Sequence, residues 1–252
     1  DNKKTMVEGI VMGTDSRGLA QILTKVDPLR PSNIQLEKDL VDLIYEPLVQ
    51  VEYSQDDNKK WTTSVREILA SEIVKIRAGA DYQFNLRKDI KWHDNYDFTA
   101  DDIIKTLDIM ATLPNDNAYI NAIKQMRWEK INDYSVRICT KARKDDVSCN
   151  DTRENPIFSN FLELMSVKII PAHKTSDMTE TNLQRGNVEL FKSPVGTGPY
   201  KFASADSQSI NLKINDSYKF RTALSKIEYK DLYDFYNNYI AATTNNDEVK
   251  AS

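Results

Sequence analysis

The chain has 252 residues, enough for one or two domains of about 100–200 residues each with a sizeable apolar core. With 40% hydrophobic and 29% charged residues, it falls outside the disordered, collagen-like and disulfide-scaffold classes. Its net charge of −4 provides no overall basic field, which argues against nucleic-acid binding as its main task. No run approaches the roughly 18 consecutive apolar residues of a membrane-spanning helix, so no such span is predicted.

The first third of the chain reads as a strand, a loop and a helix. Residues 5–12 are rich in apolar and β-branched types and predict a buried strand, which ends in a turn-rich loop at residues 13–18. Ser32 followed by Gln35 forms a capping-box pattern, and it predicts a helix that stops before Pro47. The apolar face of this helix contains Leu36, Leu40, Leu43 and Ile44.

The middle of the chain alternates between strand and helix patterns. The polar segment at residues 54–60 is a candidate domain boundary. Apolar side chains then alternate with polar ones over residues 82–87, the period of a half-buried strand. Thr99 and Asp102 cap a predicted helix, whose buried side carries Ile103, Ile104, Leu107, Met110 and Ala111. A hairpin is predicted around a two-residue turn at Asn132-Asp133.

The last third begins with a short amphipathic helix expected between residues 157 and 165. Residues 167–170 are expected to form a strand, and a glycine turn at 194–199 leads into a hairpin that returns through Ile210, Leu212 and Ile214. A Tyr-rich helix is expected over 229–242.

Few residue patterns in this sequence favour catalysis. No nucleophile elbow occurs, only His93 and His173 are available as histidine bases, and the abundance of carboxylates is weak support for a glycosidase. The same scarcity leaves few ligands for a metal site, so no metal or other cofactor is expected. Cys139 and Cys149 are either a local disulfide or two free thiols.

Three polar clusters have both structural and functional interpretations. Gly196-Thr197-Gly198 lacks the lysine of a phosphate loop and is interpreted as a tight turn that needs positive φ or close backbone approach. If the strand continues through His93 and Asp94, their side chains point to opposite faces and do not pair, so a structural role is favoured over an oriented base. Asp101 and Asp102 are interpreted as helix-capping carboxylates rather than metal ligands.

Four segments, taken in order, resemble one family: the extracellular solute-binding proteins of family 5, which are peptide, dipeptide and nickel receptors of bacterial ABC importers. The segments are DLIYEPLV at 42–49, YQFNLR with IKWHD at 82–94, FTADDI at 98–103 and VGTGPYKF at 195–202. The family usually has glycine after W-H-D, whereas Asn95 stands here; asparagine tolerates the left-handed conformation, so the turn can survive.

The resemblance implies a mixed α/β, periplasmic-binding-protein-like fold of type II, cluster C, in which two lobes close on a ligand. It assigns residues 1–50 and 165–220 to the first lobe and 51–164 to an inserted α+β subdomain. Residues 221–252 are then the start of the second lobe or a frayed tail. Because family members are about twice as long, the second lobe is expected to be missing from this sequence.

The resemblance also implies a function and a site. The expected function is non-catalytic binding of peptides, or a similar small solute, for delivery to an ABC permease. The expected protein is a monomer with no nucleic-acid partner, periplasmic or extracellular, and either free or lipid-anchored. A sensory or protein-interaction module that reuses the scaffold without transport is the alternative. The ligand-binding residues are expected in the strand-end loop and after the T-A-D-D helix: Gly13, Thr14, Asp15, Ser16, Arg17 and Tyr119. For Tyr119, packing within the inserted subdomain is an equally weighted alternative.

Overall fold

The computed structural model describes residues 25–30, 35–55, 59–114, 117–141, 149, 154–205 and 210–218. The chain divides into two units, 1–218 and 219–252, and every described residue lies in the first. The predicted strand at 5–12, the loop at 13–18 and the helix at 229–242 lie outside the described residues. Within the described ranges, no helix has the length and apolar character needed to cross a bilayer.

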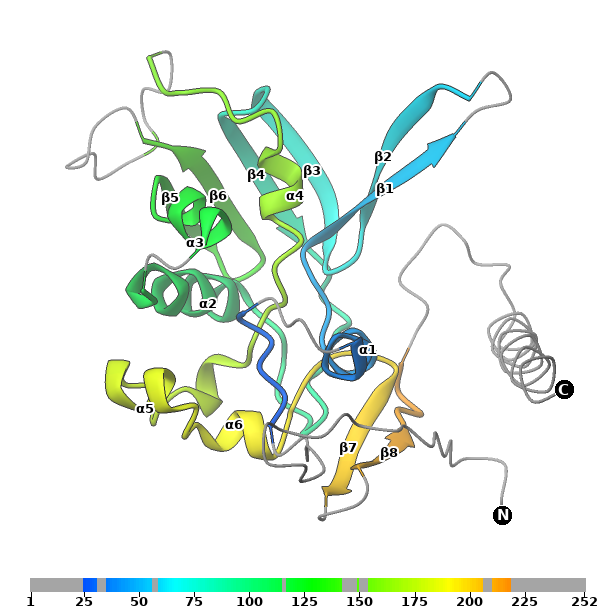
Figure 1. The fold of residues 1–252 in the computed structure, drawn as a ribbon. Helices are drawn as coiled ribbons and strands as arrows, with labels where there is room; N and C mark the ends of the chain where they lie inside the picture. Colours follow the sequence, from blue (N-terminus) through cyan, green and yellow to red (C-terminus); the bar gives the residue numbers. More distant parts are fainter. Residues whose placement is uncertain are drawn as a thin grey trace, which may run out of the picture. The chain divides into compact units, whose positions relative to one another are not determined.

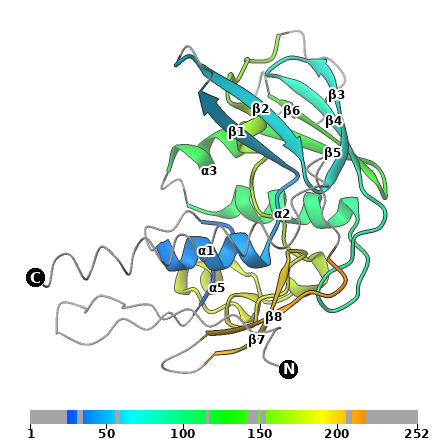
Figure 2. The same ribbon diagram turned by 90° about the vertical axis from the view of Figure 1, so that its right-hand side faces the viewer.

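All of the described strands pair antiparallel (Figures 1 and 2). The largest sheet has four strands in the order β3-β4-β6-β5, and two separate hairpins are formed by β1-β2 and β7-β8. The strands are β1 (Val49–Gln55), β2 (Trp61–Glu67), β3 (Ala70–Arg77), β4 (Asp81–Leu86), β5 (Met126–Asn132), β6 (Ser135–Thr140), β7 (Tyr200–Ala205) and β8 (Ile210–Ile214).

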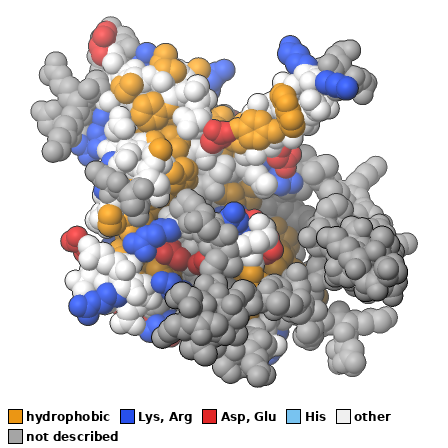
Figure 3. Space-filling view, viewed as in Figure 1, with side chains coloured by type: hydrophobic (Ala, Val, Ile, Leu, Met, Phe, Trp, Pro, Cys, Tyr) orange, Lys and Arg blue, Asp and Glu red, His pale blue; other side chains and the backbone are white. Residues whose placement is uncertain are grey.

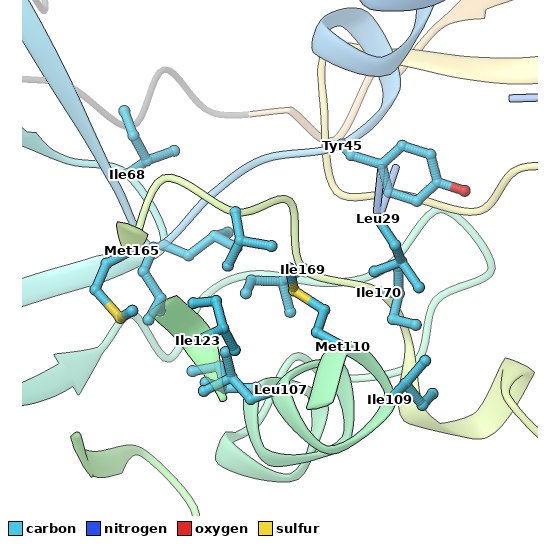
Figure 4. Packing of buried hydrophobic residues seen from close by; sticks show 14 of the residues in the cluster. Leu29, Tyr45, Ile68, Leu107, Ile109, Met110, Ile123, Met165, Ile169 and Ile170 are labelled. Carbon is cyan, nitrogen blue, oxygen red and sulfur yellow. The ribbon is translucent and has the colours of Figure 1, made fainter. Parts of the chain in front are cut away.

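The helices are short apart from two. They are α1 (Gln35–Ile44), α2 (Ala100–Thr112), α3 (Ala118–Ile123), α4 (Phe161–Leu164), the 3₁₀ turn η2 (Ala172–Lys174), α5 (Glu180–Arg185) and α6 (Glu189–Lys192). Helix α2 packs against β5 and β6, and Leu107 and Met110 on its buried side lie beside Ile169 and Ile170 of the segment after α4 (Figure 4). One apolar core therefore joins the four-stranded sheet to the helices.

The apolar patterns correctly predicted β4, α1 and α2. In β4, Tyr82, Phe84 and Leu86 are buried while the side chains between them are half-buried. In α1, Leu40 and Ile44 are buried, as expected for one helical face. At the start of α2, the backbone N–H of Thr99 donates to the Asp102 carboxylate at 2.9 Å, which confirms the predicted cap.

Asp102 does more than cap its helix. Its carboxylate also accepts hydrogen bonds from the Trp92 indole at 3.1 Å and from the backbone N–H of Ala172 at 2.8 Å. Burial raises the pKa of this carboxyl, while the three donors favour its charged form. One buried side chain thus ties the W-H-D turn, the start of α2 and η2 together.

Three expectations need correction. The β5-β6 turn consists of Asp133 and Tyr134, one residue later than predicted, because Asn132 still pairs with Ser135. Residues 167–170 form no strand; Lys168 makes a single bridge to Pro47. The polar segment at 54–60 connects β1 and β2, which pair as one hairpin. The expected lobe boundaries remain a prediction.

The glycine turn at 194–199 is held against the end of α1 by close backbone approach. The N–H of Gly198 donates to the Ile44 carbonyl at 2.9 Å. A Cβ on Gly196 would stand 1.8 Å from that carbonyl oxygen, and a Cβ on Gly198 would stand 2.5 Å from the Leu43 oxygen. Gly196 and Gly198 are needed for this close approach and not for a positive φ. Among the described glycines, positive φ occurs at Gly79 and Gly186.

The cysteine alternative is resolved by the structure, in which Cys139 and Cys149 are joined as a disulfide. Both residues are fully buried. Cys139 lies in β6, so the bond attaches residue 149 to the four-stranded sheet. A disulfide of this kind is typical of proteins that work outside the cytoplasm.

Gly196→Ala is expected to lower the free energy of unfolding by about 2 kcal/mol or more, because the new methyl group overlaps a carbonyl that cannot move without displacing α1. Urea denaturation followed by circular dichroism measures this change. Lys213→Ala, on the exposed side of β8, is the control and is expected to change stability little. Wild-type stability in Gly196→Ala would contradict the close approach.

Candidate functional site

His93 connects the W-H-D turn to the glycine turn through both of its ring nitrogens. The N–H of Gly196 donates to Nδ1 at 3.1 Å, and Nε2 lies 2.9 Å from the carbonyl oxygen of Gly198. The His93 backbone N–H also donates to the Gly196 carbonyl at 2.9 Å. Since Nδ1 accepts a hydrogen bond, the proton must be on Nε2. The ring is therefore neutral, and both of its nitrogens have hydrogen-bond partners.

The protonation state of His93 follows from this environment. Burial is the main cause that lowers the pKa of His93 to about 4, and the positive charge of Lys201 acts in the same direction. A histidine held neutral, with both nitrogens bonded to backbone, has no free nitrogen to act as a general base. The structural interpretation of His93 is therefore the one that the geometry supports.

Asp94 belongs to a separate surface cluster. Its Oδ2 lies 2.8 Å from His173 Nε2 and 3.5 Å from Lys174 Nζ, and the Tyr96 ring stacks on the His173 ring with centroids 4.0 Å apart. His93 and Asp94 do not pair, as expected, but the reason differs from the expected one: residues 93–94 form a turn and do not continue a strand. Asn95 adopts φ 73°, which confirms that asparagine takes the left-handed position in this turn.

The two aspartates of the T-A-D-D motif have structural partners. Asp101 forms an ion pair with Lys130 at 2.9 Å, and Asp102 forms the buried network described above. Among the described residues, no cluster of three or more His, Cys, Asp or Glu side chains is arranged to hold a metal ion.

The predicted ligand residues fall into two groups. Gly13, Thr14, Asp15, Ser16 and Arg17 lie outside the described residues, so their role stays a prediction. Tyr119 lies near the start of α3, and its hydroxyl donates to the Leu164 carbonyl at 3.0 Å. Burial raises the pKa of this hydroxyl, which stays protonated. Tyr119 packs against the core and also lines a surface hollow.

This hollow, which we call the polar hollow, has a volume of about 310 Å³. It lies where the segment before α1, α1 itself, α3 and the chain after α4 meet. Its lining consists of residues 27–30 together with Lys38, Val41, Asp42, Tyr119, Glu163, Ser166, Val167 and Lys168.

Some of the charges around the polar hollow are already paired. Asp42 and Lys168 form an ion pair at 2.8 Å, and Arg30 contacts Asp27 at 3.4 Å while it donates to the Leu183 carbonyl. Asp27 is buried; burial raises the pKa of its carboxyl, which accepts the N–H of Leu29 at 2.9 Å. These contacts fix the walls of the hollow.

Other polar groups of the hollow are unused. Lys38 and Glu163 have no ion-pair partner among the described residues, and the buried Ser166 hydroxyl has no hydrogen-bond partner there. The hollow therefore offers one free cation, one free carboxylate and one unsatisfied hydroxyl. Such a set can bind a small solute that carries charges of both signs.

Among the residues that line the polar hollow, the sequence predicted only Tyr119 as a ligand contact, and it did not identify Lys38, Glu163 or Ser166. Lys38 is more than a hundred residues away from Glu163 and Ser166 along the chain, and no spacing motif links it to them. Only the packing of α1 beside the chain after α4 brings them together.

Comparison with known proteins places the chain in a family. The sequence profile described as bacterial extracellular solute-binding proteins, family 5, middle region, matches residues 64–246. The oligopeptide-binding protein AppA of Bacillus subtilis is 26% identical over 174 residues, which is 68% of this chain and 30% of AppA. Heme-binding protein A of Haemophilus influenzae is 26% identical over 204 residues, 72% of this chain and 34% of that protein.

Solved structures share the fold. AppA of B. subtilis in complex with a nonapeptide has a TM-score of 0.58 and 23% identity, covering 83% of this chain and 36% of AppA. NikZ of Campylobacter jejuni in complex with Ni(L-His) has a TM-score of 0.58 and 19% identity, covering 85% and 37%. The chain belongs to the family 5 bacterial extracellular solute-binding proteins and has their mixed α/β, periplasmic-binding-protein-like fold. It spans about a third of the length of the curated relatives it matches.

The neutral His93 predicts a specific pH dependence of stability. In the unfolded chain the ring takes up a proton as the pH falls below about 6.5, whereas in the folded protein it resists protonation until about pH 4. Stability is therefore lost between pH 6.5 and 4, by up to about 3 kcal/mol, and this loss levels off below pH 4.

Urea denaturation of His93→Gln across this pH range tests the prediction. Glutamine can accept and donate hydrogen bonds but does not titrate, so the decline is expected to be shallower than in wild type. His173→Gln removes the other histidine and serves as the control. An unchanged decline in His93→Gln would show that His93 does not hold its neutral form in the fold.

Proposed function

We propose that the protein is the substrate-binding component of an ABC importer and that it binds short peptides, or a similar small solute, at the polar hollow. The observation that carries this proposal is the set of unused polar groups: the Lys38 ammonium, the Glu163 carboxylate and the buried Ser166 hydroxyl. A peptide presents a carboxylate and an ammonium at its two ends, so it complements Lys38 and Glu163 without requiring a particular side chain.

The position of the polar hollow supports the proposal. Residues 27–30 and α1 belong to the expected first lobe, whereas Tyr119 and Glu163 belong to the expected insertion, so the hollow lies where the two parts meet. Sites between structural subdivisions are common for small ligands, because closure can bury the solute. The loop at 13–17 is proposed to add backbone contacts to the same ligand.

The relatives support peptides as the first ligands to test. AppA was solved with a nonapeptide, and the DppA protein of Helicobacter pylori, described as ABC transporter-associated, was solved with the peptide STSA at a TM-score of 0.53. NikZ carried Ni(L-His), and another relative is a heme-binding protein, so other solutes occur in the family. An ABC permease is the proposed partner, and the protein is proposed to act as a monomer.

The same proposal places the protein outside the cytoplasmic membrane, in the periplasm or at the cell surface, free or with a lipid anchor. The buried disulfide between Cys139 and Cys149 supports this location, since such bonds persist in oxidising compartments. Binding without catalysis is supported by His93, whose ring nitrogens are both engaged with backbone.

Lys38→Met and Glu163→Gln are each expected to weaken the binding of tri-alanine by about 10-fold or more, because each variant removes one charge-assisted contact with a peptide terminus. Isothermal titration calorimetry on the full-length protein measures the dissociation constants. Lys105→Met, on the exposed side of α2, is the matched control and is expected to bind as wild type does. If both site variants bind tri-alanine as tightly as wild type does, the polar hollow is not the binding site. If the wild-type protein binds no peptide, the peptide proposal is wrong.

A variant of Tyr119 distinguishes a role in ligand contact from a role in packing. Tyr119→Phe removes the hydroxyl that donates to Leu164, so unfolding free energy is expected to fall by about 1 kcal/mol while the ring remains available to a ligand. Tri-alanine affinity is then expected to stay within about twofold of wild type. A large loss of affinity at unchanged stability would instead assign the hydroxyl to the ligand.

A further inference from the structure

A buried carboxylate holds the chain at the point where it leaves the first unit. That unit ends at Tyr218, and the second unit begins at Lys219. The Tyr218 hydroxyl donates to Oε1 of Glu46 at 2.9 Å, although the two residues are 172 positions apart. Glu46 is 5% exposed, and a hydrogen bond to a carboxylate in such surroundings is stronger than one at an open surface.

Residues 215–218, which we call the exit turn, are also attached to the glycine turn. The backbone N–H of Asn215 donates to the Pro199 carbonyl at 2.8 Å, and the Asn215 side-chain amide donates to the Gly198 carbonyl at 3.0 Å. The backbone N–H of Tyr218 donates to the Asn215 carbonyl at 2.8 Å and closes the turn. The exit turn is therefore held at both ends, by the glycine turn and by Glu46.

Glu46 lies where the chain passes from α1 to β1, and its backbone contacts the segment that returns after α4. The Glu46 carbonyl accepts the N–H of Ile169 at 3.1 Å, and the next residue, Pro47, forms the bridge to Lys168. Glu46 thus bonds the returning segment through its backbone and the exit turn through its side chain. Three passages of the chain meet at this one residue.

The returning segment is also a wall of the polar hollow. Residues 166–168 line the hollow, and Lys168 forms its ion pair with Asp42 of α1 at 2.8 Å. Ile169, the next residue, makes the hydrogen bond to the Glu46 carbonyl. A continuous series of contacts therefore runs from the hollow to Tyr218, and packed, hydrogen-bonded series of this kind can carry coupling between two places in a protein.

We propose that the hydrogen bond between Glu46 and Tyr218 couples solute binding at the polar hollow to the exit turn, and that both are positioning residues. This inference rests on the proposed function, in which the polar hollow holds the solute. A solute that restrains residues 166–168 also restrains Glu46 through Ile169, and Glu46 in turn restrains Tyr218. Occupancy of the hollow thus reaches the point where the chain enters residues 219–252, although the solute touches neither positioning residue.

The local shape of the exit turn does not require the Tyr218 hydroxyl. The turn is closed by its own backbone, the Asn215 side chain accepts the N–H of Ser217 at 3.3 Å, and the same side chain holds the glycine turn. What the hydroxyl adds is the link to Glu46 and, through it, to the wall of the hollow. Tyr218→Phe therefore removes the link and leaves the other contacts of the turn in place.

Hydrogen–deuterium exchange and calorimetric titration of the full-length protein with tri-alanine test this inference in wild type and in Tyr218→Phe. In wild type, tri-alanine is expected to slow exchange around the polar hollow and also in the exit turn. In Tyr218→Phe, the slowing around the hollow is expected to remain and the slowing in the exit turn to disappear. The affinity for tri-alanine is expected to fall about 5-fold, at the lower end of couplings between sites.

Glu46→Met removes the acceptor of the same hydrogen bond and tests the pair from its other side. If the two residues act only through this bond, the double variant with Tyr218→Phe binds tri-alanine no more weakly than the weaker single variant. Losses of affinity that add in the double variant would show independent actions and overturn the coupling.

Tyr53→Phe is the matched control, since it removes a tyrosine hydroxyl from the projecting β1-β2 hairpin, on which Figure 3 shows hydrophobic side chains. Tyr53 is 57% exposed and does not line the polar hollow, so this variant is expected to respond to tri-alanine as wild type does.

Two results separate this inference from the proposed function. If tri-alanine binds but the exit turn does not respond in wild type, or responds equally in Tyr218→Phe, the coupling is wrong and the proposed function stands. If tri-alanine does not bind to wild type, the proposed function fails and this inference fails with it.

Discussion

The close approach of the glycine turn to the end of α1 is the constraint on which the rest of the described structure depends. Gly196 and Gly198 allow the turn to lie directly on the Ile44 carbonyl, and His93 fixes both glycines from the W-H-D turn. Asp102 then links that turn to α2 and η2. Lys38 of α1 and Glu163 of α4 both line the polar hollow.

The residues whose types most suggest catalysis, His93 and Asp102, have structural roles. His93 is kept neutral by burial and uses both ring nitrogens on backbone groups, and Asp102 is surrounded by three donors. In the polar hollow, the groups without a partner among the described residues are instead a lysine, a glutamate and a buried serine hydroxyl. This division suits a binding protein, in which charge and shape recognise the solute and no side chain needs to act as a base.

Local patterns predicted the local elements. Alternation identified β4, and the capping pattern identified α2. His93 and Asp94 do not pair, but they lie in a turn and not on the strand from which their separation was predicted. Predictions failed where tertiary contacts decide: residues 167–170 are held by one bridge rather than a ladder, and the β5-β6 turn shifted by one residue. The polar hollow could not be predicted, because its groups come from α1, α3 and the chain after α4 and share no motif. The loop at 13–17 stays a prediction.

Hydrogen–deuterium exchange on the full-length protein, with and without a saturating concentration of tri-alanine, tests the central claim most directly. The account predicts slower exchange at residues 27–30, in α1 and at residues 163–168, where the polar hollow would close around the peptide. The β5-β6 hairpin, which does not line the polar hollow, is expected to exchange at the same rate in both states. Unchanged exchange around the polar hollow, with protection appearing elsewhere, would contradict the claim.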